Sequence, residues 1–133
     1  MGTGSGILSI AAAYKKVKEI LAIDIDPNAV RATEFNWAEN QFPKPVDFKV
    51  LEGGFDHPEI PNKSYDLMLG NITYAVISQN IEHIKKIKTN RFFFFFLIIE
   101  KKEDSIKLFT EHLGGKLVYE EQFNDWIILE WER

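Results

Sequence analysis

Apolar and polar residues follow two different periods along this chain of 133 residues. Apolar runs bounded by turn residues predict strands at Glu19–Asp24, Val46–Leu51, Tyr65–Leu69 and Phe92–Ile99. Apolar positions at helical spacing predict helices at Ile7–Ala13, from Pro27 onward, at Ile72–Lys88 and at Asp104–Leu113. This alternation of helix and strand is typical of an α/β fold with a mostly parallel sheet and helices on both faces.

The end of the chain has a different pattern. Lys116–Phe123 and Trp126–Trp131 read as two strands joined through Asn124-Asp125, which predicts a C-terminal antiparallel hairpin. The run of five phenylalanines at the start of Phe92–Ile99 predicts a strand buried on both faces, as at the centre of a parallel sheet. The whole apolar run is too short to cross a bilayer, and we expect no membrane association.

The candidate chemistry lies at the beginning of the chain. Gly2, Gly4 and Gly6 alternate with small polar residues and lead directly into an apolar helix, and the next strand ends in Asp24. Glycine allows a ligand to approach the backbone closely, and a helix start presents free N–H groups. A carboxylate one strand away can accept hydrogen bonds from both hydroxyls of a ribose. This layout predicts a nucleotide-type site in an open α/β sheet, although the glycines alone are also compatible with a tight turn.

Composition narrows the class of protein. The chain is 45% hydrophobic and 27% charged, with a net charge of −4, which gives no general attraction to nucleic acid. The basic cluster Lys85, Lys86, Lys88 and Arg91 is interpreted as a solvated helix end, so we expect no direct nucleic-acid binding. The absence of cysteine excludes disulfides, Cys-ligated zinc and thiol nucleophiles, and fits a cytoplasmic protein. No group of His, Asp and Glu residues indicates a metal site.

These motifs together resemble class I S-adenosylmethionine-dependent methyltransferases, and among them the PrmA-type ribosomal protein methyltransferases. Residues 2–12 resemble the family's first motif, and residues 22–27 resemble its second. Gly70-Asn71-Ile72 is similar to the end of the family's fourth strand, and Asp125-Trp126 to its closing hairpin. The resemblance covers nearly the whole chain and implies a Rossmann-like methyltransferase sheet, with 1–133 as a partial catalytic domain.

The chain also departs from the family pattern. The strand that precedes the glycine motif in the family, and the N-terminal domain that docks the ribosomal substrate, have no counterpart here. That first strand would lie centrally, so we expect a sheet interrupted at this point, with two inner strand edges unpaired. We therefore expect that the natural protein extends upstream of Met1. The isolated chain is expected to be marginally stable, oligomeric or inactive.

The resemblance implies a role for each candidate residue. Gly2, Gly4 and Gly6 would cradle S-adenosylmethionine, and Asp24 would bind its ribose, since Asp26 already fills the helix-capping role. Ile25 would pack against the adenine, or is an ordinary core residue. Asn71 would contact the methionine moiety or steer the acceptor amine as a catalytic residue, and it also suits the N-cap of the next helix.

The function predicted on this basis is methyl transfer from S-adenosylmethionine to a protein amine, with a large-subunit ribosomal protein as the substrate that the family implies. Two alternatives remain. The chain is a non-catalytic or partner-dependent remnant of such an enzyme, or it is a nicotinamide-dependent oxidoreductase. The spacing G-x-G-x-G and the terminal hairpin both argue against the oxidoreductase.

Overall fold

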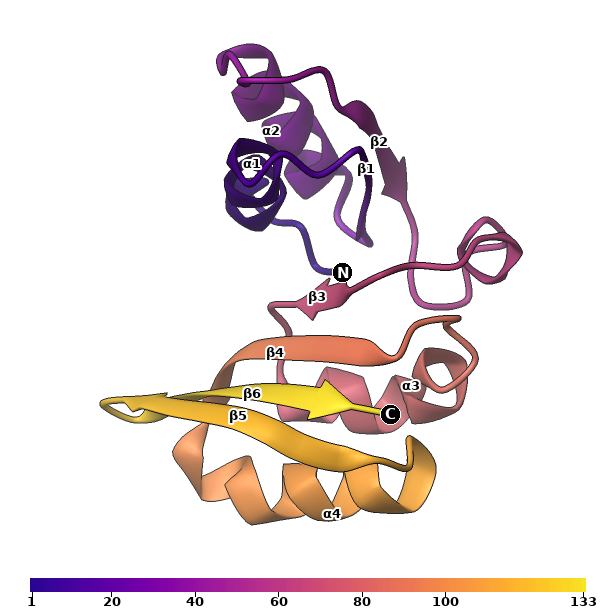
Figure 1. Cartoon of the computed structure of the whole chain (residues 1–133), viewed down its shortest axis with the longest axis vertical. Coiled ribbons are helices and arrows are strands. Elements are labelled where there is room, and N and C mark those ends of the chain that lie inside the picture. The colour runs from indigo at the N-terminus through magenta and orange to yellow at the C-terminus, as the bar shows by residue number, and fades with distance from the viewer. The chain divides into compact units, whose positions relative to one another are not determined.

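The computed structural model describes residues 1–133 apart from the side chain of Phe96. The chain forms two compact units, Met1–Gly54 and Phe55–Arg133, which are described separately (Figure 1). Both combine parallel strands with helices, as the alternating pattern predicts.

The first unit consists of α1 (Ile7–Tyr14), β1 (Glu19–Asp24), α2 (Pro27–Ala38) and β2 (Asp47–Glu52). The strands β1 and β2 are parallel and paired from Glu19–Asp47 to Asp24–Glu52. All four elements were predicted from the sequence, with bounds that differ by at most one residue wherever both ends were predicted.

Two local interactions explain why α2 forms where it does. The Oδ1 atom of Asp26 accepts a hydrogen bond from the backbone N–H of Asn28 at 2.8 Å, and Pro27 occupies the first helical position. This confirms Asp26 as the N-cap. Near its other end, α2 places Trp37 in a parallel stack on Phe48 of β2, with ring centroids 3.7 Å apart. The helix is therefore fixed to the sheet by an aromatic contact.

The second unit contains four strands and two α-helices. Its elements are the 3-10 turn η1 (Ile60–Asn62), β3 (Met68–Gly70), α3 (Tyr74–Ile84), β4 (Arg91–Ile98), the 3-10 turn η2 (Ile99–Lys101), α4 (Lys102–His112), β5 (Lys116–Phe123) and β6 (Trp126–Glu132). The strand order is β3-β4-β6-β5. β3 and β4 are parallel, whereas β6 runs antiparallel to both of its neighbours, which confirms the predicted hairpin.

Helix α3 is shorter than predicted at both ends. It begins after Thr73, whose extended backbone and side chain form the N-cap, and it ends at Ile84. Beyond Ile84 the backbone continues in tight turns, in which the N–H of Ile87 donates to the carbonyl of Ile84 at 3.1 Å. Ile87 remains buried there, so its apolar position has the helical spacing without belonging to the helix.

The phenylalanine strand β4 has two unequal faces. Phe92 and Phe94 are fully buried, and the ring of Phe94 stacks on Phe109 of α4 at 4.6 Å. Phe93 and Phe95, on the opposite face, are only half-buried. The predicted burial on both faces is therefore complete on one face alone, although β4 does lie inside its sheet.

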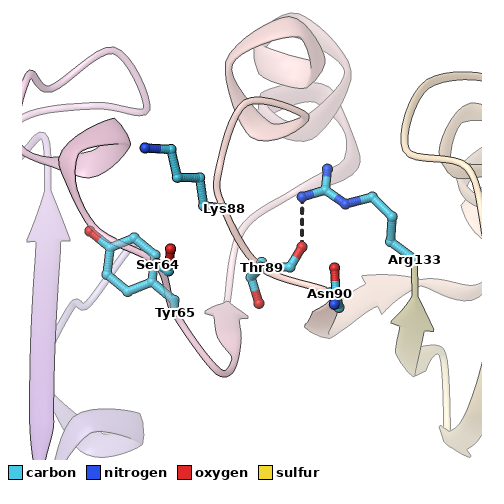
Figure 2. Close-up of a pocket in the computed structure, with 6 residues that line it drawn as sticks. All are labelled: Ser64, Tyr65, Lys88, Thr89, Asn90 and Arg133. Carbon is cyan, nitrogen blue, oxygen red and sulfur yellow. Dashed lines mark hydrogen bonds between the residues drawn. The ribbon is translucent and has the colours of Figure 1, made fainter.

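Arg133 fastens the end of the chain to the C-terminal end of α3. Its guanidinium donates to the carbonyl oxygens of Lys85, Ile87 and Thr89, at 2.6–2.8 Å, and lies over the ring of Phe92. This positive charge suits a helix C-terminus, where carbonyl groups lack helical partners. Figure 2 shows the Arg133–Thr89 bond beside a polar hollow of about 330 Å³, lined by Ser64, Tyr65, Lys88, Thr89, Asn90 and Arg133.

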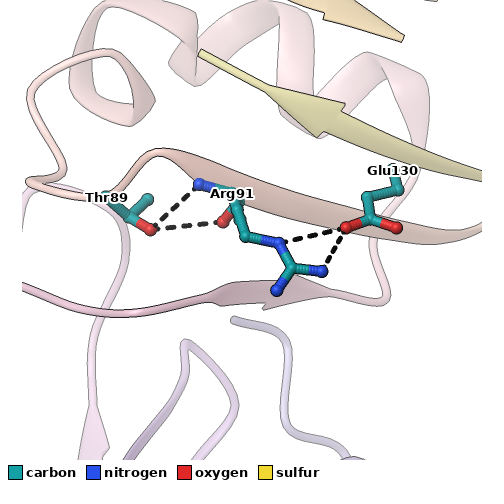
Figure 3. Close-up of polar contacts among 3 residues, drawn as sticks. All are labelled: Thr89, Arg91 and Glu130. Atoms are coloured by element: carbon teal, nitrogen blue, oxygen red, sulfur yellow. Dashed lines mark hydrogen bonds and ion pairs between the residues drawn. The ribbon is translucent and has the colours of Figure 1, made fainter. Parts of the chain in front are cut away.

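A cross-strand ion pair lies on the half-buried side of the sheet. The Nε of Arg91 donates to Oε1 of Glu130 at 3.1 Å, and Thr89 bonds both the N–H and the carbonyl of Arg91 (Figure 3). The carboxylate of Glu130 raises the pKa of Arg91 above its ordinary value, mainly through this hydrogen bond. The start of β4 is thereby joined to β6.

The strands of the chain form two separate sheets, β1-β2 and β3-β4-β6-β5, which confirms the expected interruption. Within the described part of the chain, no helix combines the length and apolar character needed to cross a membrane.

Ser105 of α4 gives a prediction about stability. It is fully buried, and its hydroxyl has no hydrogen-bond partner among the described residues. Replacing Ser105 with Ala removes a buried polar group and improves helix propensity, so we expect the free energy of unfolding to rise by about 1 kcal/mol. Urea unfolding followed by circular dichroism measures this change.

Ser78→Ala is the matched control, because the Ser78 hydroxyl already donates to the carbonyl of Ala75 at 3.0 Å. We expect a smaller gain there, since helix propensity rises but a hydrogen bond is lost. A loss of stability in Ser105→Ala would contradict the proposed origin of the effect.

Candidate functional site

The glycine turn at the start of the chain is held against β1. The backbone N–H of Thr3 donates to the carbonyl of Ile23 at 3.1 Å, and the N–H of Gly6 donates to the carbonyl of Thr3 at 2.8 Å. Gly2, Gly4 and Gly6 all have positive φ angles, of 64°, 56° and 85°. Residues other than glycine rarely adopt this backbone conformation, so the shape of the turn itself requires the alternating glycines.

Asp24 connects this turn to the next helix. Its Oδ2 accepts from the N–H of Gly4 at 2.9 Å, and its Oδ1 accepts from the N–H of Asp26 at 3.0 Å. Asp26 is the N-cap of α2, as expected, but Asp24 makes two structural hydrogen bonds of its own, which the sequence does not predict. A carboxylate offers about four acceptor positions, two on each oxygen, so these two backbone bonds alone do not use all of them.

Helix α2 supports the turn from the other side. The hydroxyl of Thr33, which is buried, donates to the carbonyl of Gly4 at 3.1 Å, and the side-chain amide of Asn36 donates to the carbonyl of Ser5 at 2.8 Å. A Cβ at Gly6 would lie 3.1 Å from Cγ2 and 3.3 Å from Cα of Thr33. Gly6 is thus also needed for close packing against α2.

The sequence places Thr33 on the apolar face of α2, between Val30 and Trp37, but does not reveal its role. A lone threonine on an apolar helical stripe is the available signal, because a buried hydroxyl requires a partner. That partner, the carbonyl of Gly4, becomes evident only from the structure.

Two further groups beside the turn are open to a ligand. Gly6 is the N-cap of α1 and provides no side-chain cap, so the helix start can offer N–H groups to a bound polar group. Ile25 follows Asp24 and is 76% exposed, which makes the alternative of an ordinary core residue wrong. Glu52 of β2 is the register partner of Asp24.

Asn71 belongs to the second unit, where it directly follows β3 and is exposed. The alternative that it caps α3 is wrong, because the N-cap is Thr73, whose Oγ1 accepts from the N–H of Val76 at 3.4 Å. Asn71 therefore lies at the carboxyl end of a parallel strand with no capping duty, in the position where ligands of such sheets bind.

Asn71 is not among the residues that line the polar hollow of Figure 2. Ser64 pairs with Lys88 before β3 and β4 begin, so the hollow lies at the amino ends of these parallel strands. In the described part of the chain, no group of three or more His, Asp or Glu residues is placed to hold a metal ion.

A comparison with protein families shows to which family this chain belongs. The family described as ribosomal protein L11 methyltransferase (PrmA) matches residues 1–133. The chain belongs to this family. The glycine turn, Asp24 and the C-terminal hairpin thus occur together in a chain whose entire length fits one methyltransferase family.

Individual relatives agree with this assignment. A ribosomal protein L11 methyltransferase of Leptospira interrogans is 46% identical over 133 residues, which is 100% of this chain and 44% of that protein. The Staphylococcus aureus protein of the same name is 32% identical over 130 residues, 97% of this chain and 40% of its own length. The chain thus spans less than half the length of these curated relatives.

Solved structures share the fold. The ribosomal protein L11 methylase of Lactobacillus delbrueckii subsp. bulgaricus superposes with a TM-score of 0.85 at 25% identity, over 99% of this chain and 66% of that one. Magnesium protoporphyrin IX methyltransferase from Synechocystis, crystallised with bound SAH, gives a TM-score of 0.76 at 16% identity, over 99% and 71%. The predicted Rossmann-like methyltransferase fold is confirmed, as a fragment of the domain.

The geometry of the turn predicts unequal effects of alanine at two glycines. At Gly4 a Cβ meets nothing within 4 Å, so Gly4→Ala should lower the free energy of unfolding by about 1–2 kcal/mol through its positive φ alone. Gly6→Ala adds the clash with Thr33, and we expect a loss of about 2–4 kcal/mol. Chemical denaturation of the purified variants measures both.

The double variant Gly6→Ala with Thr33→Ser tests the cause. It removes the Cγ2 atom that the new methyl group meets at 3.1 Å, so part of the lost stability should return, as a favourable coupling energy between the two sites. Strict additivity of the two substitutions would show that the clash is not the reason.

Proposed function

We propose that residues 1–133 form a partial catalytic domain of an S-adenosylmethionine-dependent methyltransferase that modifies an amine of a ribosomal protein. The observation that carries this proposal is the carboxylate of Asp24, held by the N–H groups of Gly4 and Asp26 at the carboxyl end of β1. Membership of the L11 methyltransferase family, and the names of its relatives, support ribosomal protein L11 as the substrate.

The residues of the first unit fit a nucleoside with a charged tail. Asp24 would accept hydrogen bonds from the ribose hydroxyls at positions that its two backbone bonds leave, and the exposed Ile25 beside it offers an apolar surface for a planar base. The uncapped start of α1 offers backbone N–H groups to the carboxylate of an amino-acid tail. Each part of S-adenosylmethionine therefore has a counterpart of suitable chemistry.

When bound, S-adenosylmethionine would supply an electrophilic methyl group on a positively charged sulfur. The methyl group would pass to an acceptor nitrogen that has given its proton to solvent, and the sulfur would leave as a neutral thioether. The side chains of the site need only position the reactants, which contributes up to about 7–11 kcal/mol to lowering a barrier. Asn71, at the end of β3, has an amide oxygen able to accept a hydrogen bond from an acceptor amine.

A cytoplasmic location accords with this proposal, because the chain has no cysteine and its family modifies a ribosomal protein. The substrate is a protein, and neither nucleic acid nor membrane is needed as a partner. The proposal also includes a further partner for this chain, which is either a second copy in an oligomer or a segment that precedes residue 1.

Removing the charge of Asp24 tests the proposed cofactor site. A charge-assisted hydrogen bond contributes about 1.5–3 kcal/mol, so Asp24→Asn should weaken the binding of S-adenosylhomocysteine by about ten- to a hundredfold. Isothermal titration calorimetry measures this affinity directly and does not require activity.

Asp26→Asn is the matched control. It makes the same chemical change two residues away, and asparagine caps a helix as well as aspartate does, so the affinity should stay within about threefold of the unchanged chain. No saturable heat with the unchanged chain would refute the proposal and favour a non-catalytic remnant. Equal effects of the two substitutions would remove Asp24 from the site.

Asn71→Ala separates two proposed roles of that side chain. If Asn71 steers the acceptor amine, methylation of L11 should slow by at least tenfold while the affinity for S-adenosylhomocysteine is unchanged. If it contacts the methionine moiety, that affinity falls too. The control is Asn62→Ala, whose amide donates to the carbonyl of Pro58 in a loop. An Asn71→Ala variant with full activity and affinity would contradict both roles.

A further inference from the structure

Three apolar side chains form an exposed row where the C-terminal hairpin turns. Ile98 of β4 is the register partner of Trp126 in β6, and Trp126 is the register partner of Phe123 in β5. Directly paired residues of a sheet project from the same face, so the three side chains lie side by side. They are 44%, 43% and 69% exposed, respectively, and together form what we call the hairpin row.

The sheet beneath the hairpin row is firmly packed. Leu97 and Ile127 are the neighbouring register pair, and their side chains, on the opposite face, are fully buried. The exposure of the row is therefore a property of one face of an ordered sheet. A contiguous apolar patch of this kind commonly marks a site of interaction.

The hairpin row lies at the carboxyl end of β4 and is linked to the segment after β3. The N–H of Ile99 donates to the carbonyl of Asp125 at 2.8 Å, which fixes the turn of the hairpin beside η2. From η2, the ammonium of Lys101 lies 5.4 Å from the ring centre of Tyr74, at the start of α3. Tyr74 is three residues from Asn71, so the row and the proposed acceptor-steering amide belong to one edge of the second unit.

Acidic side chains surround the row. Glu121 and Asp125 are exposed on the hairpin itself, and Glu100 is exposed in η2. The lysines of this region already have carboxylate partners: Lys101 pairs with Asp104, and Lys102 pairs with Glu120, both at 2.8 Å. A surface of this charge attracts a cationic partner and raises its rate of association.

We propose that the hairpin row is a second docking surface, additional to the N-terminal docking domain that the family resemblance implies, and that it binds a basic segment of the protein acceptor and places an amine of that segment near Asn71. The apolar row binds an apolar side chain of the segment, and the carboxylates of Glu121 and Asp125 bind its cationic flanks. This inference rests on the proposed function. It adds a surface that binds the protein acceptor, at the same edge of the second unit as Asn71.

Binding of ribosomal protein L11 tests the docking surface without requiring catalysis. Fluorescently labelled L11 is titrated with the unchanged chain and with Phe123→Ser and Ile98→Ser, and anisotropy is recorded at low salt. Each substitution should weaken L11 binding at least tenfold and leave the affinity for S-adenosylhomocysteine within twofold. Glu121→Lys should weaken L11 binding and reduce its dependence on salt.

Phe35→Ser is the matched control, because Phe35 is 66% exposed on α2 and lies outside the hairpin row. It should leave L11 binding unchanged. The proposal is overturned if the unchanged chain does not bind L11, or if the hairpin variants bind it as well as Phe35→Ser does. It is also overturned if sedimentation shows a dimer that Phe123→Ser dissociates, because the row is then a self-association surface.

The two proposals can fail separately. If the unchanged chain does not bind S-adenosylhomocysteine, the methyltransferase function is refuted, whatever the L11 titration shows. Normal cofactor binding combined with L11 binding that is insensitive to the hairpin variants refutes the docking surface alone.

Discussion

The candidate site depends on one carboxylate that accepts two backbone hydrogen bonds. Asp24 is bonded to Gly4 before α1 and to Asp26 before α2, so one side chain fixes the starts of two helices relative to β1. These two hydrogen bonds also hold the carboxylate in a single orientation. A ligand that uses its remaining acceptor positions therefore meets a preorganised group and loses little free energy to ordering it.

Helix α2 completes this arrangement from the opposite side. Thr33 and Asn36 donate hydrogen bonds to carbonyl groups of the glycine turn, and the absence of a Cβ at Gly6 allows that approach. The turn thus receives support from a strand end and from a helix face. Its left-handed conformations, unfavourable for most residues, are stabilised by these contacts and by glycine itself.

The sequence predicted the elements of the chain well because their signals are local. Asp26-Pro27 determined the start of α2, and the Asn124-Asp125 turn determined the hairpin. The ends of α3 were mistaken, since Ile87 keeps helical spacing in a turn that is not helical. Among the site residues, the structural bonds of Asp24 and the role of Thr33 depend on contacts between residues far apart in sequence, which no local pattern reports.

The position of the phenylalanine strand has a consequence for synthesis on the ribosome. β4 pairs on one edge with β3, which precedes it in the chain. Its other edge stays unpaired until β6, the last strand of the chain, has been synthesised. At translation rates of about 5–20 residues per second, the interval between the end of β4 and the end of β6 is roughly two to seven seconds. During that time an aromatic strand has one open edge, and the nascent chain is most exposed to wrong partners at this stage.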